Sequence, residues 1–315
     1  MRILVTGANG QLGHDVMNEL LLRGHEAVAS GSSPAYCGPA DGTAVTMAPF
    51  VQMNVTDSAN VDAVLSRIRP DAVIHCSAWT AVDAAEDPEN RKKVFALNVV
   101  GPRNLAAACA ALDSSMMQIS TDYVFSGNGS EPWKPDQEEY QPINYYGETK
   151  LMGEKAVRSA IQKYFIVRTA WVFGYAGNNF VKTMLRLGET HDHLRVVNDQ
   201  IGTPTYTHDL ARLLADMIET DKFGVYHATN EGGYISWFDF AQEIFHQAAA
   251  MGHEEYAQSR LTVEPVSTAE YGQSKAARPF NSRLDKSKLC EMGFEPLPDW
   301  RDALGRYLRE YFEER

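Results

Sequence analysis

Short apolar runs rich in β-branched residues recur along the first half of the chain and alternate with amphipathic stretches. Runs of this composition are typical of strands. In the stretch HDVMNELLLRG, Val16 and Leu20 stand one helical turn apart, which places both on one face of a helix, and Gly24 then supplies a stop. The predicted strands cover residues 3–5, 26–29, 51–53, 72–75, 116–119 and 165–168.

The alternation of strands with helices predicts the fold class. Several of the runs are apolar throughout, as expected for strands that are covered on both faces, and sheets of this kind are parallel with right-handed crossovers. We therefore expect an α/β protein with a doubly wound parallel sheet of the Rossmann type.

Beyond about residue 175 the pattern is less regular and predicts a smaller C-terminal substrate domain. It contains a helical stretch at 237–251, a segment with Pro and Ser at about 262–282, and a terminal helix with a solvated charged face. We expect residues 1–174 and roughly 196–230 to form the larger domain, and roughly 175–195 and 231–315 to form the smaller one. Residues 31–48, rich in Gly, Ser, Pro and Ala, predict a loop.

Charge and cysteine content indicate which partners, structural sites and cellular compartments are unexpected for this protein. The chain has 315 residues and a formal net charge of -12, from 41 acidic and 29 basic side chains, which argues against binding to a nucleic-acid backbone. Its four cysteines form no C-x-x-C pair, which favours a reducing cytoplasm over a disulfide framework or a zinc site. The N-terminus reaches glycine too soon for a signal peptide, and no later run suggests a membrane span.

A glycine-rich turn lies between the first predicted strand and the first helix. The stretch VTGANGQLG contains Gly7, Gly10 and Gly13. Glycines at a strand-to-helix turn let backbone N–H groups approach a pyrophosphate at the helix N-terminus, where the helix dipole favours an anion. A tight turn without a ligand is the alternative, but the position between strand and helix favours a dinucleotide.

The end of the second predicted strand bears on the choice of dinucleotide. An NAD site usually has an Asp or Glu there for the ribose 2′-hydroxyl, whereas this chain reads VASGSS. Ser30, Ser32 and Ser33 offer hydroxyls for a 2′-phosphate, without a carboxylate to repel it and without an arginine beside it. The pattern favours NADPH and leaves NADH open; serines that belong only to the loop are the alternative.

The stretch YYGETK raises the question of which tyrosine is catalytic. In a helix, Tyr146 and Lys150 share a face, whereas Tyr145 does not reach the lysine. A nearby ammonium should lower the pKa of the tyrosine and fit it for acid-base work. The upstream strand end ISTDYVFSG brings Thr121 and Asp122 to the carboxyl edge of the sheet, where ligands of open α/β folds bind.

These features together resemble an extended short-chain dehydrogenase/reductase, and finer motifs are similar to the dTDP-4-dehydrorhamnose reductases. The similar stretches run in order from residue 5 to residue 285. They are VTGANGQLG, AWTAVDAAE, NVVGPRNLA, STDYVFSG, YYGETKLMGE, RTAWVFG, NNFVKTML, DQIGTPTY and RPFNSRLD.

The resemblance implies reduction of the C4 ketone of dTDP-4-dehydro-L-rhamnose, a dTDP-6-deoxy-L-hexulose, to dTDP-L-rhamnose for cell-surface polysaccharide. Tyr146 would donate a proton to the C4 oxygen, Lys150 would tune it and hold the nicotinamide ribose, and Thr121 would polarise the ketone. The larger domain would bind the dinucleotide and the smaller one the sugar nucleotide. The implied cofactor contacts, besides the three glycines, Tyr146 and Lys150, are Gln11, Leu12, Asn54, Val55, Ala78, Trp79 and Thr80; the implied sugar contacts are Val82, Thr121, Asp122 and Trp171.

The chain departs from the family pattern in two places. The family commonly has Asp where Asn54 stands, and the loop at 31–49 is long for the family. Some members bind magnesium through acidic residues at a dimer contact. No such residues are matched here, so the resemblance leaves magnesium open and allows a homodimer. His191 and His193 in THDH have no third ligand at useful spacing and predict a solvated turn rather than a metal site.

Other functions stay open at this point. A dehydratase or epimerase of the same fold would keep its cofactor bound, but dehydratases tend to have a second acid after the strand-end threonine, where this chain has Tyr123 following Asp122. A non-catalytic regulatory subunit is the option from another class. Trp171 by itself is consistent with a core residue or with a platform for a sugar ring, and the resemblance favours the platform.

Overall fold

The computed structural model describes residues 1–40, 42–272 and 274–313. Its centre is a parallel seven-stranded sheet in the order β11-β6-β5-β4-β1-β2-β3. The doubly wound parallel sheet predicted from the sequence is therefore confirmed, and all six predicted strands lie in it. The strands are β1 (Arg2–Thr6), β2 (Glu26–Gly31), β3 (Phe50–Gln52), β4 (Ala72–His75), β5 (Ser115–Thr121), β6 (Tyr164–Thr169) and the unpredicted β11 (Gly224–His227).

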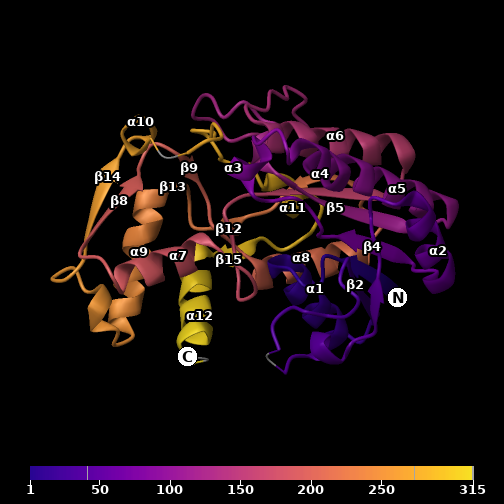
Figure 1. Cartoon of the computed structure of the whole chain (residues 1–315), viewed down its shortest axis with the longest axis horizontal. Helices are drawn as coiled ribbons and strands as arrows, with labels where there is room; N and C mark the ends of the chain where they lie inside the picture. The colour runs from indigo at the N-terminus through magenta and orange to yellow at the C-terminus, as the bar shows by residue number, and fades with distance from the viewer. Residues whose placement is uncertain (41, 273, 314–315) are drawn as a thin grey trace.

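Helices cover both faces of this sheet (Figure 1). Side chains alternate along each strand, so that in β1 Ile3 and Val5 pack on one side and Leu4 packs on the other. The first side is covered by α1 (Gln11–Leu22) and α8 (Thr207–Ile218). The second is covered by α2 (Ser58–Ile68), α5 (Gly101–Ala111) and α6 (Tyr145–Ala160).

One continuous helical stretch, Arg91–Ala111, combines α4 (Arg91–Phe95), a π-helical turn η2 (Ala96–Val100) and α5. By length and composition its 21 residues are apolar enough to cross a membrane, contrary to the expectation from the sequence, but half of its most apolar window is buried inside the protein. Such burial is the property of a core helix, and it explains why the stretch is apolar.

A second lobe surrounds the parallel pair β8 (His193–Val197) and β14 (Thr262–Val266), at the left of Figure 1. Its core is formed by α7 (Phe180–Gly188), α9 (Trp237–Ala250) and α12 (Trp300–Glu313), which bring Phe240, Phe245, Trp300 and Tyr307 together. The helix predicted at 237–251 is thus confirmed. Ser236 and Asp239 form a capping box at its start.

The division of the chain into two domains stays a prediction. β8 pairs with β14 of the second lobe, whereas Leu289, Phe294 and Leu297 lie in the core beneath α1 and α8.

The predicted loop at residues 31–48 contains the short helix η1 (Ala44–Met47), and residue 41 lies outside the described part. The remaining elements are α3 (Val82–Ala85), η3 (Asp122–Val124), β7 (Val172–Phe173), β9 (Ile201–Gly202), β10 (Thr205–Tyr206), β12 (Asn230–Glu231), β13 (Ile235–Ser236), η4 (Glu254–Tyr256), α10 (Thr268–Tyr271), α11 (Ser287–Glu291) and β15 (Leu297–Asp299).

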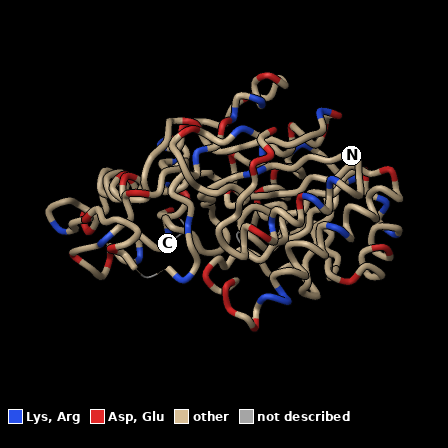
Figure 2. Tube along the Cα trace, turned by 90° about the horizontal axis from the view of Figure 1, so that it is seen from above, with Lys and Arg blue, Asp and Glu red and all other residues tan. Residues whose placement is uncertain are grey.

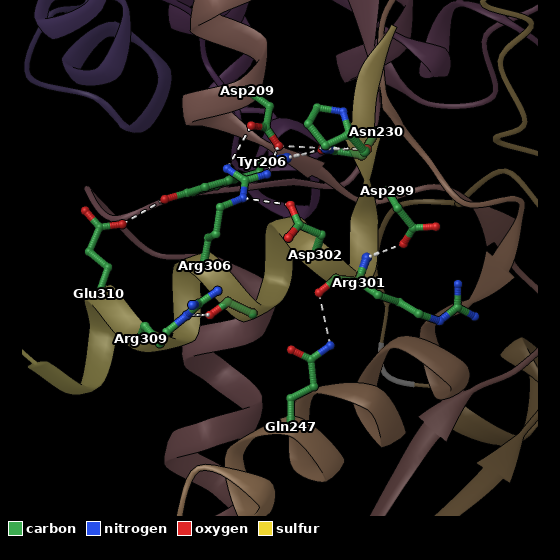
Figure 3. A network of polar contacts seen from close by, with 12 residues as sticks. Tyr206, Asp209, Asn230, Gln247, Asp299, Arg301, Asp302, Arg306, Arg309 and Glu310 are labelled. Atoms are coloured by element: carbon green, nitrogen blue, oxygen red, sulfur yellow. Dashed lines mark hydrogen bonds and ion pairs between the residues drawn. The ribbon is translucent and has the colours of Figure 1, made fainter.

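The C-terminal helix α12 is tied to α8 by a polar network (Figure 3). Arg306 of α12 reaches Asp209 of α8, and Tyr206 donates to Glu310 at 2.8 Å. Elsewhere, acidic and basic residues alternate along the backbone trace of both lobes, as Figure 2 shows. The last helix therefore joins the two lobes, in addition to the segments of the chain that pass from one lobe to the other.

Candidate active site

The carboxyl ends of the central strands arrange the predicted site in a row. The loops after β2, β1, β4, β5 and β6 are neighbours in that order, because these strands are adjacent in the sheet. They carry, respectively, the serine-rich strand end, the glycine turn, residues 78–80, Thr121 and Trp171. An extended ligand laid along this edge meets all five loops, which is the usual ligand position in open α/β sheets.

The glycine turn has the close packing of a phosphate cradle. Gly10 precedes α1 and its N–H bonds the carbonyl oxygen of Gly7 at 2.9 Å. A Cβ added at Gly13 would lie 2.2 Å from that same oxygen, so only glycine allows this approach. Leu12 is buried, and the Gln11 side chain contacts Asn179 at 2.9 Å and Val172 O at 3.3 Å. The turn thus fits a dinucleotide pyrophosphate at the start of a helix.

The serine-rich end of β2 contains one buried hydroxyl that is available to a ligand. Ser30 is fully buried, and its hydroxyl has no hydrogen-bond partner within the described residues. Ser33 donates to Ala35 O at 2.6 Å and accepts from Asn9 at 3.0 Å, so its hydroxyl serves the loop itself, while Ser32 is exposed. A buried hydroxyl without a partner next to the glycine turn is consistent with a bound ribose.

Asn54 and Val55, expected at the adenine end, follow β3 at the outer edge of the sheet. The Asn54 side-chain oxygen accepts from the N–H and the hydroxyl of Thr56, at 3.1 and 2.8 Å. Val55 is buried, and its carbonyl accepts from Asn104 at 3.0 Å. The Asn54 oxygen is therefore occupied by a local turn, in place of the role that the family commonly gives to Asp.

Residues 78–80 are held in place by Asn98, a residue that the sequence did not single out although NVVGPRNLA contains it. Asn98 is buried in the π-helical turn, accepts from the Trp79 N–H at 2.9 Å and donates to Thr149 of α6 at 3.2 Å. It thereby joins the loop after β4 to the helix that carries Tyr146. Ala78 and Trp79 are partly buried and Thr80 is exposed.

Tyr146 and Lys150 lie on one face of α6, directly beside the end of β5. Asn144 caps the helix by accepting from the Gly147 N–H at 2.8 Å. A Cβ at Gly147 would lie 2.2 Å from Tyr123 O, so this glycine brings the helix start against the turn that follows Thr121. The Tyr146 ring packs edge-on against Tyr123, with centroids 5.4 Å apart.

Tyr145 points elsewhere, as its spacing predicted. Its N–H donates to Glu86 at 2.7 Å, its hydroxyl donates to Arg91 O at 3.4 Å, and the Arg91 guanidinium lies over its ring. These contacts attach Tyr145 to α3 and α4. Its role in the structure is packing.

The ionisation of Tyr146 differs from the sequence expectation. Burial raises the pKa of Tyr146, and hydrogen bonding with the Thr121 hydroxyl only partly opposes this. Lys150 does not lower that pKa here; its Nζ donates to Ile119 O at 2.7 Å, and burial lowers its own pKa to about 8, opposed by the Glu154 carboxylate. The expectation was wrong because burial disfavours the charged phenolate and no charge effect of Lys150 on Tyr146 offsets it. Tyr146 is therefore a neutral phenol that can donate a proton.

Thr121 and Asp122 form the strand end beside Tyr146. The Thr121 hydroxyl donates to Asp122 at 3.0 Å and accepts from the Tyr123 N–H at 3.3 Å. The second carboxylate oxygen of Asp122 is buried and has no hydrogen-bond partner within the described chain. Burial raises the pKa of Asp122 to about 6, although hydrogen bonding by the Ser282 and Thr121 hydroxyls opposes this, so the carboxyl group can take a further hydrogen bond from a ligand hydroxyl.

Trp171 follows β6 in a strained conformation, with a φ of 51° that is rare for a bulky side chain. Its ring stacks on Trp237, with centroids 3.7 Å apart and planes 14° apart. Trp171 is partly buried and stands between the two lobes, because Trp237 begins α9 of the second lobe. Val82, also partly buried, begins α3 on the other side of Thr121.

Residues 275–278, from the second half of the chain, pack against α3 and the start of α6 beside the site. Arg278 binds Asp83 of α3 with two contacts, at 3.0 and 2.7 Å, and this interaction lowers the pKa of Asp83. Asn144 donates to Ala277 O at 2.7 Å, and Lys275 pairs with Asp87. Residues 275–278, which end at the first residue of the motif RPFNSRLD, therefore contact the region of α3 and the N-cap of α6, a position that the sequence did not reveal.

A metal site is not apparent in the described ranges, which contain no group of three or more His, Cys, Asp or Glu side chains able to hold an ion. His193 pairs with Glu264 at 3.0 Å, and His191 lies in an exposed turn.

Comparison with known proteins agrees with this geometry. The family model described as RmlD substrate binding domain matches residues 1–313. A dTDP-4-dehydrorhamnose reductase of Aggregatibacter actinomycetemcomitans is 36% identical and covers 99% of both chains.

Solved structures give the same result. A dTDP-4-dehydrorhamnose reductase of Clostridium acetobutylicum has a TM-score of 0.86 and 38% identity over 99% of this chain and 100% of its own. One from Bacillus anthracis in complex with NADP has a TM-score of 0.83 and 38% identity, covering 98% and 99% of the two chains. The chain therefore belongs to the RmlD substrate binding domain family, and its similarity to dTDP-4-dehydrorhamnose reductases extends over nearly its whole length.

Proposed function

We propose that this protein is an NAD(P)H-dependent reductase that converts the C4 ketone of dTDP-4-dehydro-L-rhamnose to the alcohol of dTDP-L-rhamnose. The observation that carries the proposal is the meeting of Thr121, Tyr146 and Lys150 at one strand end, in a chain similar to reductases of this name over nearly its whole length. The glycine turn and the catalytic strand end lie along one sheet edge, as a cofactor bound across them requires.

Tyr146 is the general acid in this proposal. A phenol at its ordinary pKa of about 10 is already neutral at pH 7, and burial raises the pKa of Tyr146 further, so this side chain carries the proton that the C4 oxygen needs when the ketone becomes an alcohol. Thr121 stands next to it and places a hydroxyl beside the same oxygen. Its bonds to Asp122 and to the Tyr123 N–H fix the position of the hydroxyl oxygen, and its single hydrogen, which is donated to Asp122 without substrate, would turn to the C4 oxygen when substrate binds.

Lys150 places a positive charge behind Tyr146. It is 4% exposed and is anchored to the carbonyl of Ile119, which leaves its other N–H groups to hold a nicotinamide ribose. When bound, the reduced nicotinamide supplies a hydride to the ketone carbon. The glycine turn would hold the pyrophosphate, with Gln11 and Leu12 beside it, and residues 78–80, held by Asn98, would cover the middle of the cofactor.

The sugar would lie between Val82 and Trp171, above Thr121. Asp122 offers a buried carboxylate oxygen without a partner, which is suited to accept a bond from a sugar hydroxyl. Trp171 offers a ring fixed by its stack on Trp237. The substrate would thus be recognised by one acceptor and one aromatic ring from neighbouring strand ends.

Either cofactor is expected to serve. The Bacillus anthracis relative was solved with NADP, and we infer NADPH as the first cofactor. However, no Lys or Arg lies between Arg23 and Arg67, the part of the chain that includes β2, β3 and the loop joining them. A 2′-phosphate would rest on neutral donors only, so the discrimination against NADH should be weak.

The expected surroundings are those of a cytoplasmic enzyme. All four cysteines are free thiols, as a reducing compartment allows. Association into a homodimer stays a prediction.

The testing experiment follows NADPH and NADH oxidation by absorbance, with dTDP-4-dehydro-L-rhamnose generated in situ. Tyr146→Phe should lower kcat by about 10²- to 10⁴-fold, the range for loss of a general acid, with cofactor affinity nearly unchanged. Tyr145→Phe is the matched control, because it removes a hydroxyl one residue away that only contacts Arg91 O. Retained turnover in Tyr146→Phe would refute the mechanism.

Two outcomes would point to the other candidates. Purification with a full complement of tightly held NAD, and no net oxidation, would indicate a dehydratase or epimerase. Binding of cofactor without turnover, together with stoichiometric co-purification of an enzyme, would indicate a regulatory subunit.

A further inference from the structure

A buried carboxylate lies one helical turn beyond Lys150. Glu154 of α6 follows Tyr146 and Lys150 at four-residue spacing, so all three share one face of the helix. Its side chain is only 1% exposed and faces Arg168 of β6, which is fully buried. A buried ion pair beside a catalytic helix is costly to assemble, and each of its groups must be bonded for the pair to be tolerated.

The pair is fully bonded. Arg168 donates to Glu154 through Nε at 2.9 Å and through Nη2 at 2.7 Å, and it also donates to Tyr140 at 2.8 Å and Pro135 O at 3.2 Å. Its guanidinium lies 5.0 Å from the centre of the Phe125 ring. Such a bidentate arrangement fixes the position of the carboxylate as well as its charge.

The carboxylate also holds the catalytic strand end. Ser120, which directly precedes Thr121, donates to Glu154 at 2.5 Å. Ser120 itself is buried and turns away from Thr121, because successive residues of a strand face opposite sides. Glu154 therefore joins α6, β5 and β6 at the level where Thr121 and Tyr146 meet.

The same carboxylate acts on the charge of Lys150. Burial lowers the pKa of Lys150 to about 8, and Glu154 is the largest influence that opposes this. The other groups facing Lys150 supply little negative charge. From β4, His75 is buried with a pKa lowered to about 3, and Cys76 has a pKa raised by burial to about 12, so both are uncharged at neutral pH. Tyr146 of α6 is a neutral phenol. On β5, Thr121 and the Ile119 carbonyl are uncharged. Arg168 of β6 is positively charged and is paired with Glu154 itself.

We propose that Glu154 is a positioning residue for the reduction: held by Arg168, its carboxylate fixes the strand end that carries Thr121 and keeps Lys150 in its ammonium form. The inference rests on the proposed function for its kinetic consequences. Its effect on Lys150 is a property of the folded protein and is measurable without substrate.

The test compares Glu154→Gln with the wild type. The amide keeps the size of the side chain and an acceptor for Ser120 but removes the charge. Because activity requires charged Lys150, it falls as pH rises through the pKa of that lysine. We expect the alkaline limb of the kcat profile to move to lower pH by about one unit in Glu154→Gln, and the pKa of Lys150 followed by NMR of its Nζ to fall equally.

Two further variants separate positioning from folding. Glu154→Gln leaves Arg168 buried without a counter-charge, and this cation would itself disfavour the Lys150 ammonium. The double variant E154Q/R168M removes both charges and should show a smaller shift of the alkaline limb in the same direction. Asp209→Asn breaks a buried ion pair far from Lys150 and should lose stability without moving the limb. An unchanged Lys150 pKa in the Glu154 variants would overturn the inference.

The NMR measurement also separates this inference from the proposed function. If the wild type fails to reduce the deoxyhexulose but the Lys150 pKa falls in Glu154→Gln, the proposed substrate is wrong and the role of Glu154 stands. If the wild type is active and neither the limb nor the Lys150 pKa moves, the proposed function stands and the role of Glu154 is refuted.

Discussion

Replacement of Arg306 by methionine tests the attachment of the C-terminal helix. Arg306 donates to Asp209 through Nη1 at 2.9 Å and Nη2 at 2.7 Å, as drawn in Figure 3. The Asp209 side chain is 0% exposed, and it accepts a third hydrogen bond from Asn230 at 2.8 Å. Methionine keeps much of the apolar stem of the arginine but removes both charged donors, so Asp209 would stay buried with a single neutral donor.

The expected loss in the free energy of unfolding follows from the burial of Asp209. Breaking a buried ion pair by removal of one partner costs about 3 to 5 kcal/mol, because the remaining charge is neither solvated nor paired. Arg306 is 30% exposed, so part of its own charge is hydrated already and the lower end of the range, about 3 kcal/mol, is expected. The other contact of Arg306, to Asp302 at 2.9 Å, involves a carboxylate that is 58% exposed and should contribute at most about 0.5 kcal/mol.

Equilibrium unfolding in urea measures these differences. Arg306→Met should lose about 3 kcal/mol, Asp302→Asn about 0.5 kcal/mol or less, and D209N/R306M should recover most of the loss, because the buried charge is then gone. Hydrogen exchange should show faster exchange in α12 of Arg306→Met than in the wild type. If Arg306→Met proves as stable as Asp302→Asn, the burial argument fails and Asp209 does not need a cationic partner.

Two further predictions concern the cofactor and sugar sites. Gly13→Ala places a Cβ 2.2 Å from Gly7 O, so the turn must open, and calorimetry should show NADPH binding weakened by about tenfold or more; unchanged affinity would show that the turn does not form the pyrophosphate site. Burial raises the pKa of Asp122 from 3.8 to about 6, so the folded state binds the extra proton and this group makes the protein less stable as pH rises from about 4 to about 6. Asp122→Asn should therefore gain about 2 to 3 kcal/mol over the wild type at pH 7.5 and much less at pH 4.5 in urea unfolding, while sugar turnover falls; equal gains at both pH values would contradict the burial of this charge.

The fold was predictable where local pattern and tertiary packing agree. The six predicted strands and the helix at 237–251 carry apolar periodicity that matches their burial. The seventh strand was missed because Gly224–His227 is short and mixes glycine and histidine with its apolar residues. It exists as a strand because Val225 and Tyr226 pair in register with Ile166 and Val167 of β6, an effect of the sheet rather than of the segment.

The site was predictable to the extent that its chemistry lies in short motifs. The spacing of Tyr146 and Lys150 correctly excluded Tyr145 from the lysine's face of the helix, and the structure shows Tyr145 attached to Arg91 instead. The predicted influence of Lys150 on Tyr146 was wrong, since sequence spacing contains no information on how deeply each group is buried. Asn98 was missed for a related reason: a polar residue inside an apolar helix reads as an interruption until the loop that it holds is known.

The two carboxyl groups beside the catalytic strand end show how bonding partners separate the behaviour of two equally buried groups. Glu154 and Asp122 are both nearly inaccessible to water, at 1% and 2% exposure. Glu154 is held by Arg168 and Ser120, whereas Asp122 has no cationic partner within the described residues: burial raises its pKa, and only the hydroxyls of Ser282 and Thr121 and nearby backbone N–H groups oppose this. Because an unpaired buried charge weakens the fold, Asp122 is a cost of the apo protein that a hydrogen-bonding ligand would relieve, while Glu154 is satisfied in advance. One carboxylate therefore suits ligand recognition and the other suits positioning, although both flank the same residue, Thr121.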